Sequence, residues 1–150
     1  MRLLTAKPIR AAFVRLVELQ GAPSERIAQL RTFIDRDFGD YIVVTIMADG
    51  SDQKRKGAVN QILSSADTNA LKDVTYLERK DGKRIQLLEY RAPSPDGLGA
   101  KLVFPRTVEG KPFIEPTSGE VRFGMELGKT AKINRRFKVA DMMYEGKLEF

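Results

Sequence analysis

The feature that most constrains the fold of this chain is a change of pattern about halfway along it. In the first third, apolar residues such as Ile9, Phe13 and Val17 recur at helical spacing, and Ser24 offers an N-cap to a second helix. In the second half, short runs of alternating apolar and polar residues are separated by turn residues, which is typical of strands. Helices followed by antiparallel strands predict an α+β fold.

The segment 41–47, YIVVTIM, lies between these two parts and predicts the central strand. It is short, rich in β-branched residues and apolar on both parities, so we expect neighbours to cover both of its faces. A third, basic helix follows it.

Turn residues place the later strands. Within segment 74–91, Asp81-Gly82 predicts a β-hairpin with a two-residue type I′ turn. Segments 101–115 and 133–150 predict further hairpins, with turns at Glu109-Gly110 and Glu145-Gly146. Segment 120–127 alternates cleanly, which predicts a strand with one face on the core, and the Pro- and Gly-rich segment 91–101 predicts a surface loop.

These elements together predict a single domain, residues 1–150, of the α+β class. We expect two or three N-terminal helices to pack on one face of a curved, mainly antiparallel sheet of about six strands. The order of elements is similar to that of the nuclear-transport-factor-2-like (NTF2-like) fold. That resemblance implies a cone-shaped sheet that wraps around helices and a pocket.

The amino-acid composition excludes several classes of site. With no Cys and no His among its 150 residues, the chain lacks the usual zinc ligands, thiol nucleophiles and histidine general bases. We therefore expect no metal and no cofactor. The formal net charge of +6 at pH 7 makes polyanions favourable partners.

The N-terminal segment is interrupted by charges too often to be a signal sequence or a membrane span. We therefore expect a cytoplasmic protein, or a secreted or periplasmic one if an upstream signal has been removed.

The segment 46–63, IMADGSDQKRKGAVNQIL, raises the question of a phosphate-binding loop, because a glycine and several cations precede a helix. Its glycines, Gly50 and Gly57, are wrongly spaced for a Walker-type loop, and nearby aspartates oppose an anion. We expect the packed part of the helix to begin near Gly57. Whether Arg55 enters a cleft or pairs with a nearby aspartate is left open.

Clusters of basic residues are the candidates for anion binding. The candidate residues are Lys54, Arg55, Lys80, Lys83 and Arg84. A two-residue turn would place Lys80 opposite Lys83 and Arg79 opposite Arg84, which is unfavourable for like charges. The turn is therefore either a cationic finger for phosphate or an acidic partner, or a solvated turn. We assign the nearby aromatic residues to the core: Tyr76, Tyr90, Phe104 and Phe137.

Two further charged clusters have open interpretations. Arg135 lies on the same parity as apolar residues, so it is either buried and paired with Glu89 or Asp141, or turned outward by a bulge. The carboxylates of segment 35–40 fit caps, turns or an ion pair better than a metal site.

Three functions follow as hypotheses. The first is a non-catalytic module that binds a partner protein or a small apolar ligand on or within its sheet, because amphipathic strands are abundant and the commonest catalytic residues are scarce. The second is an anion or nucleic-acid binder that uses the basic clusters. The third is a small enzyme with an Asp or Glu general base in a pocket. The oligomeric state is not indicated.

Overall fold

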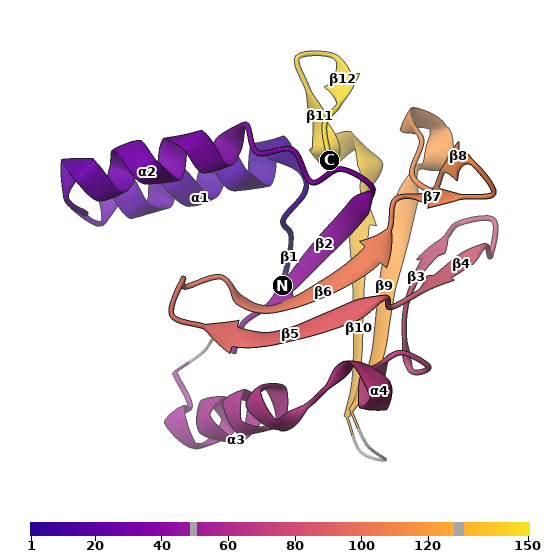
Figure 1. Cartoon of the computed structure of the whole chain (residues 1–150), viewed down its shortest axis with the longest axis horizontal. Helices are drawn as coiled ribbons and strands as arrows, with labels where there is room; N and C mark the ends of the chain where they lie inside the picture. Colours follow the sequence, from indigo (N-terminus) through magenta and orange to yellow (C-terminus); the bar gives the residue numbers. More distant parts are fainter. Residues whose placement is uncertain (49–50, 128–130) are drawn as a thin grey trace.

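The computed structural model is a mixed α+β protein, and the residues it describes form two four-stranded antiparallel sheets, two small hairpins and four α-helices (Figure 1). It describes residues 1–48, 51–127 and 131–150, without the side chains of Arg55, Leu127 and Ala131. None of the helices in these residues is long and apolar enough to cross a membrane.

The first sheet, sheet A, has the strand order β1-β2-β6-β5. Its strands are β1 (Arg2–Leu3), β2 (Tyr41–Ile46), β5 (Glu89–Ser94) and β6 (Gly99–Pro105). The predicted central strand is confirmed, since β2 lies between β1 and β6 and five of its six residues are buried. Burial on both parities follows from its β-branched sequence, which is suited to a strand with cover on both faces.

The second sheet, sheet B, has the strand order β10-β9-β3-β4. Its strands are β3 (Thr75–Arg79), β4 (Arg84–Gln86), β9 (Glu120–Leu127) and β10 (Ala131–Lys138). The alternation predicted for β9 is confirmed, because Val121, Phe123 and Met125 are buried. The strands that the sequence assigns to one sheet are thus divided between two.

The chain passes from sheet B to sheet A at a corner between β4 and β5. The backbone N–H of Leu87 donates to Thr75 of sheet B at 3.1 Å, whereas the N–H of Leu88 donates to Val103 of sheet A at 2.8 Å. A strand that changes sheets in this way turns a corner between two packed layers. The hairpin predicted over 74–91 therefore ends at Gln86.

The main core fills the space between the two sheets. The rings of Phe104 on β6 and Phe123 on β9 meet edge to face, with centroids 6.3 Å apart, a geometry that aromatic pairs prefer. Other large side chains of the same cluster are fully buried around them: Ile42, Leu63, Leu77, Leu102, Phe113 and Ile114.

We predicted that the helices pack as one layer on one face of a sheet, and the structure differs. Helices α1 (Lys7–Leu19) and α2 (Ser24–Ile34) form a hairpin that projects beyond the sheets (Figure 1), and α2 has no buried residue. Helix α3 (Gln53–Ser65) packs against β5 and sends Leu63 into the core, and the short α4 (Thr68–Leu71) follows it.

Two helix starts differ from the predictions. Pro23 is the N-cap of α2, so Ser24 is its first residue and not its cap. Helix α3 begins at Gln53 and contains Gly57, whose α-carbon faces open space. Asp49 and Gly50, from the segment 46–63 that was considered as a phosphate-binding loop, lie outside the described residues.

Short hairpins complete the fold. The two predicted turns are confirmed. One joins β7 (Thr107–Val108) to β8 (Lys111–Pro112), and the other joins β11 (Met143–Tyr144) to β12 (Lys147–Leu148). Glu109, Glu145 and the glycine after each have positive φ, as a type I′ turn requires. The 3₁₀ helices η1 (Pro116–Ser118) and η2 (Val139–Met142) flank β9 and β10. The predicted surface loop is shorter than 91–101, because β5 continues to Ser94 and β6 begins at Gly99.

Candidate functional site

The outer face of sheet A carries a small second apolar cluster. Strand β2 turns Ile42 and Val44 toward the main core and Val43 toward the opposite face. There Val43 packs with Leu4 of the chain after β1 and with Val103 of β6. This cluster forms the floor of an open cleft.

The walls of the cleft are partly buried apolar residues. Phe33 at the end of α2 and Phe38 in the loop after it meet edge to face, with ring centroids 6.2 Å apart. Leu98 and Tyr41 line the cleft as well, and the side chain of Tyr41 is half exposed. We call this feature, with its floor of Leu4, Val43 and Val103 and these walls, the sheet-A cleft. Its volume of about 370 Å³ is within the usual range for small-ligand sites, roughly 300–1,000 Å³.

Charged residues form the rim of the sheet-A cleft. Lys101 Nζ lies 2.6 Å from Asp96 Oδ2 and 3.2 Å from Ser94 Oγ, and Arg91 Nε lies 2.8 Å from Glu89 Oε1. The guanidinium of Arg36 lies over the ring of Phe38, 5.6 Å from its centroid. The rim thus combines paired cations with an arginine that rests on an apolar wall.

The rim carboxylates are poorly suited to acid–base catalysis. The hydrogen bond from Arg91 lowers the pKa of Glu89. Burial opposes ionisation of Asp96, but hydrogen bonds from Lys101 and from the backbone of Leu98 hold its pKa below the ordinary value. A general base works best with a pKa near the operating pH, so both shifts run in the wrong direction for this role.

Buried Arg10 positions the wall of the sheet-A cleft. Its guanidinium donates from Nε to the carbonyl of Ile34 at 2.8 Å and from Nη1 to that of Leu4 at 3.2 Å, and it also bonds to the carbonyl of Thr5. It lies 5.1 Å from the centroid of the Phe38 ring. Arg10 therefore joins the end of α2 to the segment that supplies the cleft floor.

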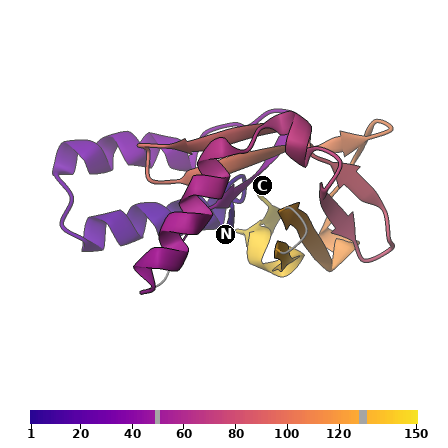
Figure 2. The ribbon, with the colours of Figure 1, turned by 90° about the horizontal axis from the view of Figure 1, so that it is seen from below.

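The structure does not bring the predicted anion-binding residues together. Lys54 lies on α3, whereas Lys80, Lys83 and Arg84 lie on the β3–β4 hairpin, and these two elements are on opposite sides of the molecule in both ribbon views (Figures 1 and 2). The side chain of Arg55 lies outside the described residues, so the question of its cleft or aspartate partner stays open. The hairpin cations and the α3 cation do not form one site.

The pairing predicted at the hairpin turn is wrong. Arg79 N–H donates to the carbonyl of Lys83 at 2.9 Å, so three residues form the loop, and Gly82 alone has a positive φ, of 83°. A three-residue loop with glycine in this conformation is a common alternative to the type I′ turn. It shifts the register so that Arg84 lies opposite Glu78 and forms an ion pair with it.

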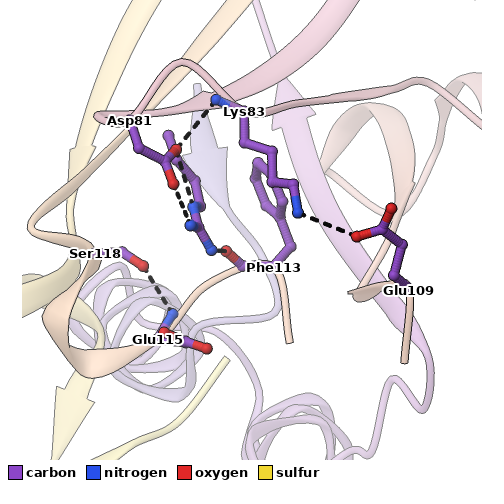
Figure 3. A network of polar contacts seen from close by, with 7 residues as sticks. Asp81, Lys83, Glu109, Phe113, Glu115 and Ser118 are labelled. Atoms are coloured by element: carbon purple, nitrogen blue, oxygen red, sulfur yellow. Dashed lines mark hydrogen bonds and ion pairs between the residues drawn. The ribbon is translucent and has the colours of Figure 1, made fainter. Parts of the chain in front are cut away.

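Arg79 and Lys83 at the turn form ion pairs with nearby carboxylates (Figure 3). Arg79 pairs with Asp81 and donates to the carbonyl of Phe113 at 3.2 Å, while Lys83 Nζ lies 3.4 Å from Glu109 Oε2. The hydrogen bond from Arg79, followed by that from the backbone of Lys83, lowers the pKa of Asp81 to about 2. The close contact between Arg79 and Asp81 fits a solvated, ion-paired turn, whereas the exposed pair of Lys83 with Glu109 is weak. A phosphate-binding finger stays a prediction.

The other charged clusters also take defined places. Arg135 is exposed on an edge strand that pairs with β9 in continuous register, so it is neither buried nor turned outward by a bulge. Asp35 pairs with Lys7 at 2.8 Å, and Asp37 accepts from the N–H of Gly39 at 2.8 Å. Within the described ranges, no group of three or more acidic residues could hold a metal ion.

Comparison of the chain with protein-family models, with curated proteins and with solved structures gives no match.

Sequence reasoning missed the sheet-A cleft. The signal was the apolar character of both parities in β2, which we took to mean complete cover on both faces. That cover is present, since Val43 and Thr45 on the outer face are 7% and 3% exposed, but Phe33 and Phe38 approach this face from one side and leave an open cleft above it. Tyr76 was also misplaced: Leu77 faces the core, and Tyr76 lies on the outer face of sheet B with Arg84 over its ring.

Proposed function

We propose that the protein is a non-catalytic module that binds a small apolar ligand with an anionic group in the sheet-A cleft. The observation that carries this proposal is the open cleft above the apolar cluster of Leu4, Val43 and Val103, which are themselves 3–7% exposed, with partly buried aromatic residues as its walls. A concave apolar surface with a few polar groups at its rim is the usual form of a small-molecule site.

The charge of the ligand follows from Arg36. Its guanidinium is exposed, and an anionic group at this rim would gain a charge-assisted hydrogen bond. The apolar body of the same ligand would lie against Phe33 and Phe38. Arg91 and Lys101 already pair with Glu89 and Asp96 and would contribute less.

The size of the cleft suits a small molecule. Its volume of about 370 Å³ lies at the lower end of the range for small-molecule sites, roughly 300–1,000 Å³. A cone-shaped sheet around a central pocket stays a prediction from the order of elements. The proposal does not depend on it, because the cleft lies on an outer face.

The two other hypotheses have less support at these residues. An enzyme with a carboxylate base is disfavoured by the lowered pKa values of Glu89 and Asp96. Anion binding by Lys54, Lys80 and Lys83 together is disfavoured because α3 and the β3–β4 hairpin are far apart (Figure 2).

The test uses anilinonaphthalene sulfonate, which joins an apolar ring system to an anionic group. Titration of the isotope-labelled protein should shift the amide resonances of Val43, Leu98 and Val103. Leu98→Asp should weaken binding about tenfold, which corresponds to about 1.4 kcal/mol, and Arg36→Gln should weaken it severalfold. Leu19→Asp is the matched control, because Leu19 is 69% exposed at the far end of α1.

Two results would contradict the proposal. One is a set of shifts that falls on the α1–α2 hairpin and not on the sheet-A cleft. The other is an equal loss of affinity in Leu19→Asp and Leu98→Asp while thermal unfolding shows that both variants are folded.

A further inference from the structure

The outer face of sheet B carries a row of charged residues across all four strands, and three of these strands contribute an arginine. Direct pairing places Arg136 of β10 beside Arg122 of β9, Arg122 beside Glu78 of β3, and Glu78 beside Arg84 of β4. Directly opposed residues of antiparallel strands project from the same face of a sheet. Three guanidiniums therefore share this row with one carboxylate.

The row presents positive charge to solvent although its members form ion pairs. The side chains of Arg84, Arg122 and Arg136 are 52%, 43% and 65% exposed, whereas that of Glu78 is 15% exposed. Arg122 Nη1 lies 3.5 Å from Glu78, and Arg136 Nη1 lies 3.9 Å from Glu120. Pairs of this length between exposed groups are weak, so these guanidiniums can exchange their carboxylates for a phosphate.

Lysines extend this charge at both ends of β10. Lys132 lies opposite Glu126 and forms an ion pair with it at 2.8 Å, and Lys138 lies opposite Glu120, on the same face as the arginine row. Both lysines are exposed. Cations thus outnumber carboxylates over the whole outer face of the sheet.

A tyrosine lies in the row next to the arginines. Asn134 of β10, Gly124 of β9, Tyr76 of β3 and Gln86 of β4 are paired across the sheet in that order. The guanidinium of Arg84 lies over the Tyr76 ring, 4.3 Å from its centroid. The other face of the ring lies against Gly124, so a nucleobase can stack on the guanidinium plane of half-exposed Arg84, which the ring supports. The exposed amides of Asn134 and Gln86 can bond to its edge.

We infer that this face, defined by Tyr76, Arg84, Arg122, Arg136, Lys132 and Lys138, binds single-stranded nucleic acid. The charge complements a phosphate backbone, and the tyrosine and arginine supply the stacking surface that distinguishes a nucleic-acid site from a general anion site. Four strands span about 14 Å at the usual strand spacing, which is the length of about four stacked nucleotides at 3.4 Å each.

A duplex fits this face less well than a single strand. The major groove of DNA admits a helix or a two-stranded ribbon, and a four-stranded face is too broad to enter it. Bases held in a duplex are also unavailable for stacking on the guanidinium plane of Arg84. The site is separate from the sheet-A cleft, because the outer faces of the two sheets point away from their shared core.

The experiment measures the fluorescence anisotropy of a labelled, mixed-sequence single strand of about ten nucleotides as the full chain is added. Between about 50 mM and about 200 mM salt, contacts to three phosphates give a slope of log affinity against log salt of about −2. Arg136→Gln should lower the affinity at low salt severalfold and reduce the slope by about 0.7. Arg26→Gln, at an exposed position on α2, makes the same change of charge away from the face and should alter neither quantity.

Variants at position 76 separate stacking from charge. Tyr76→Phe keeps the ring beneath the Arg84 guanidinium and should retain affinity. Tyr76→Leu removes this support and should weaken binding about tenfold at constant salt, as expected for the loss of one stacked base. The inference is overturned if binding does not depend on salt, if Arg136→Gln and Arg26→Gln are equally affected, if Tyr76→Leu binds like the parent chain, or if a duplex of the same sequence binds as tightly. Circular dichroism of each variant checks that it is folded.

Discussion

The ring of Tyr76 on β3 lies directly over Gly124 on the neighbouring strand β9. A β-carbon placed on Gly124 would stand 2.4 Å from Cζ of the ring, closer than non-bonded atoms approach. Glycine therefore allows the tyrosine to lie along the outer face of sheet B, where Arg84 covers it. A glycine within a strand often marks such a close approach.

Substitution of this glycine should damage both the fold and the proposed nucleic-acid face. Gly124→Ala forces the Tyr76 ring aside, so we expect the free energy of unfolding to fall by about 1–3 kcal/mol in urea titrations. Gly57→Ala is the matched control, because Gly57 is an exposed position inside α3 with open space at its α-carbon. That control should raise the stability by about 0.5–1 kcal/mol, and a loss of stability in it would contradict the helix start at Gln53.

Glu78→Gln should affect stability and nucleic-acid binding in opposite directions. Glu78 pairs with both Arg84 and Arg122, so its loss should cost about 1 kcal/mol or less, as for other partly exposed pairs. The two released guanidiniums should tighten binding of a single strand at low salt. Fluorescence anisotropy and urea unfolding of the same preparation measure the change in affinity and the change in stability. Weaker binding in a folded Glu78→Gln variant would contradict the role of the arginine row.

Arg10→Met should be strongly destabilising. The side chain is 5% exposed and bonds to the carbonyls of Leu4, Thr5 and Ile34, so the variant leaves buried acceptors without donors. We expect a loss of about 3 kcal/mol in the free energy of unfolding and a loss of probe binding in the sheet-A cleft. Arg26→Met on the exposed side of α2 should change neither, and equal effects at the two positions would refute the role of Arg10.

The hairpin turn should respond to acid through Asp81. Its hydrogen bond to Arg79 lowers the pKa of this carboxyl to about 2 in the folded protein, below the ordinary 3.8. The folded state is therefore stabilised by this group above about pH 4, and the contribution is lost as the pH falls from about 4 through 2. Titration of the Asp81 carboxyl by carbon-detected NMR measures this directly.

The NMR titration of Asp81 can be compared between two variants of neighbouring cations. Arg79→Met should return the pKa of Asp81 toward its ordinary value, because the hydrogen bond from Arg79 is the largest cause of the shift. Lys80→Met removes a neighbouring positive charge and keeps that bond, so it should leave the titration nearly unchanged. A similar rise in both variants would mean that the charge of the turn, and not the Arg79 bond, sets the pKa.

Local sequence patterns predicted individual elements well. The spacing of Ile9, Phe13 and Val17 predicted α1, and the alternation through Val121 and Phe123 predicted β9 and its buried face. These predictions succeed because the spacing of apolar residues along a helix or strand depends only on the repeat of that element and on which of its sides is buried.

Register and surface sites were not predictable in the same way. The sequence Asp81-Gly82 suits more than one loop length, and the difference of one residue decides whether Arg84 faces Arg79 or Glu78. Likewise, the sequence around Tyr76 and Leu77 is apolar on both parities, so it does not state which of the two faces the core.

The sequence by itself determined that the chain is an α+β protein without histidine or cysteine chemistry and with a central β2 strand. Only the tertiary structure decided that the strands divide into two sheets at Leu87 and Leu88. It also decided that Phe33 reaches the outer face of one sheet and that arginines from three strands line up on the other. The physical reason is that both arrangements depend on contacts between segments far apart in the chain, which no local period encodes.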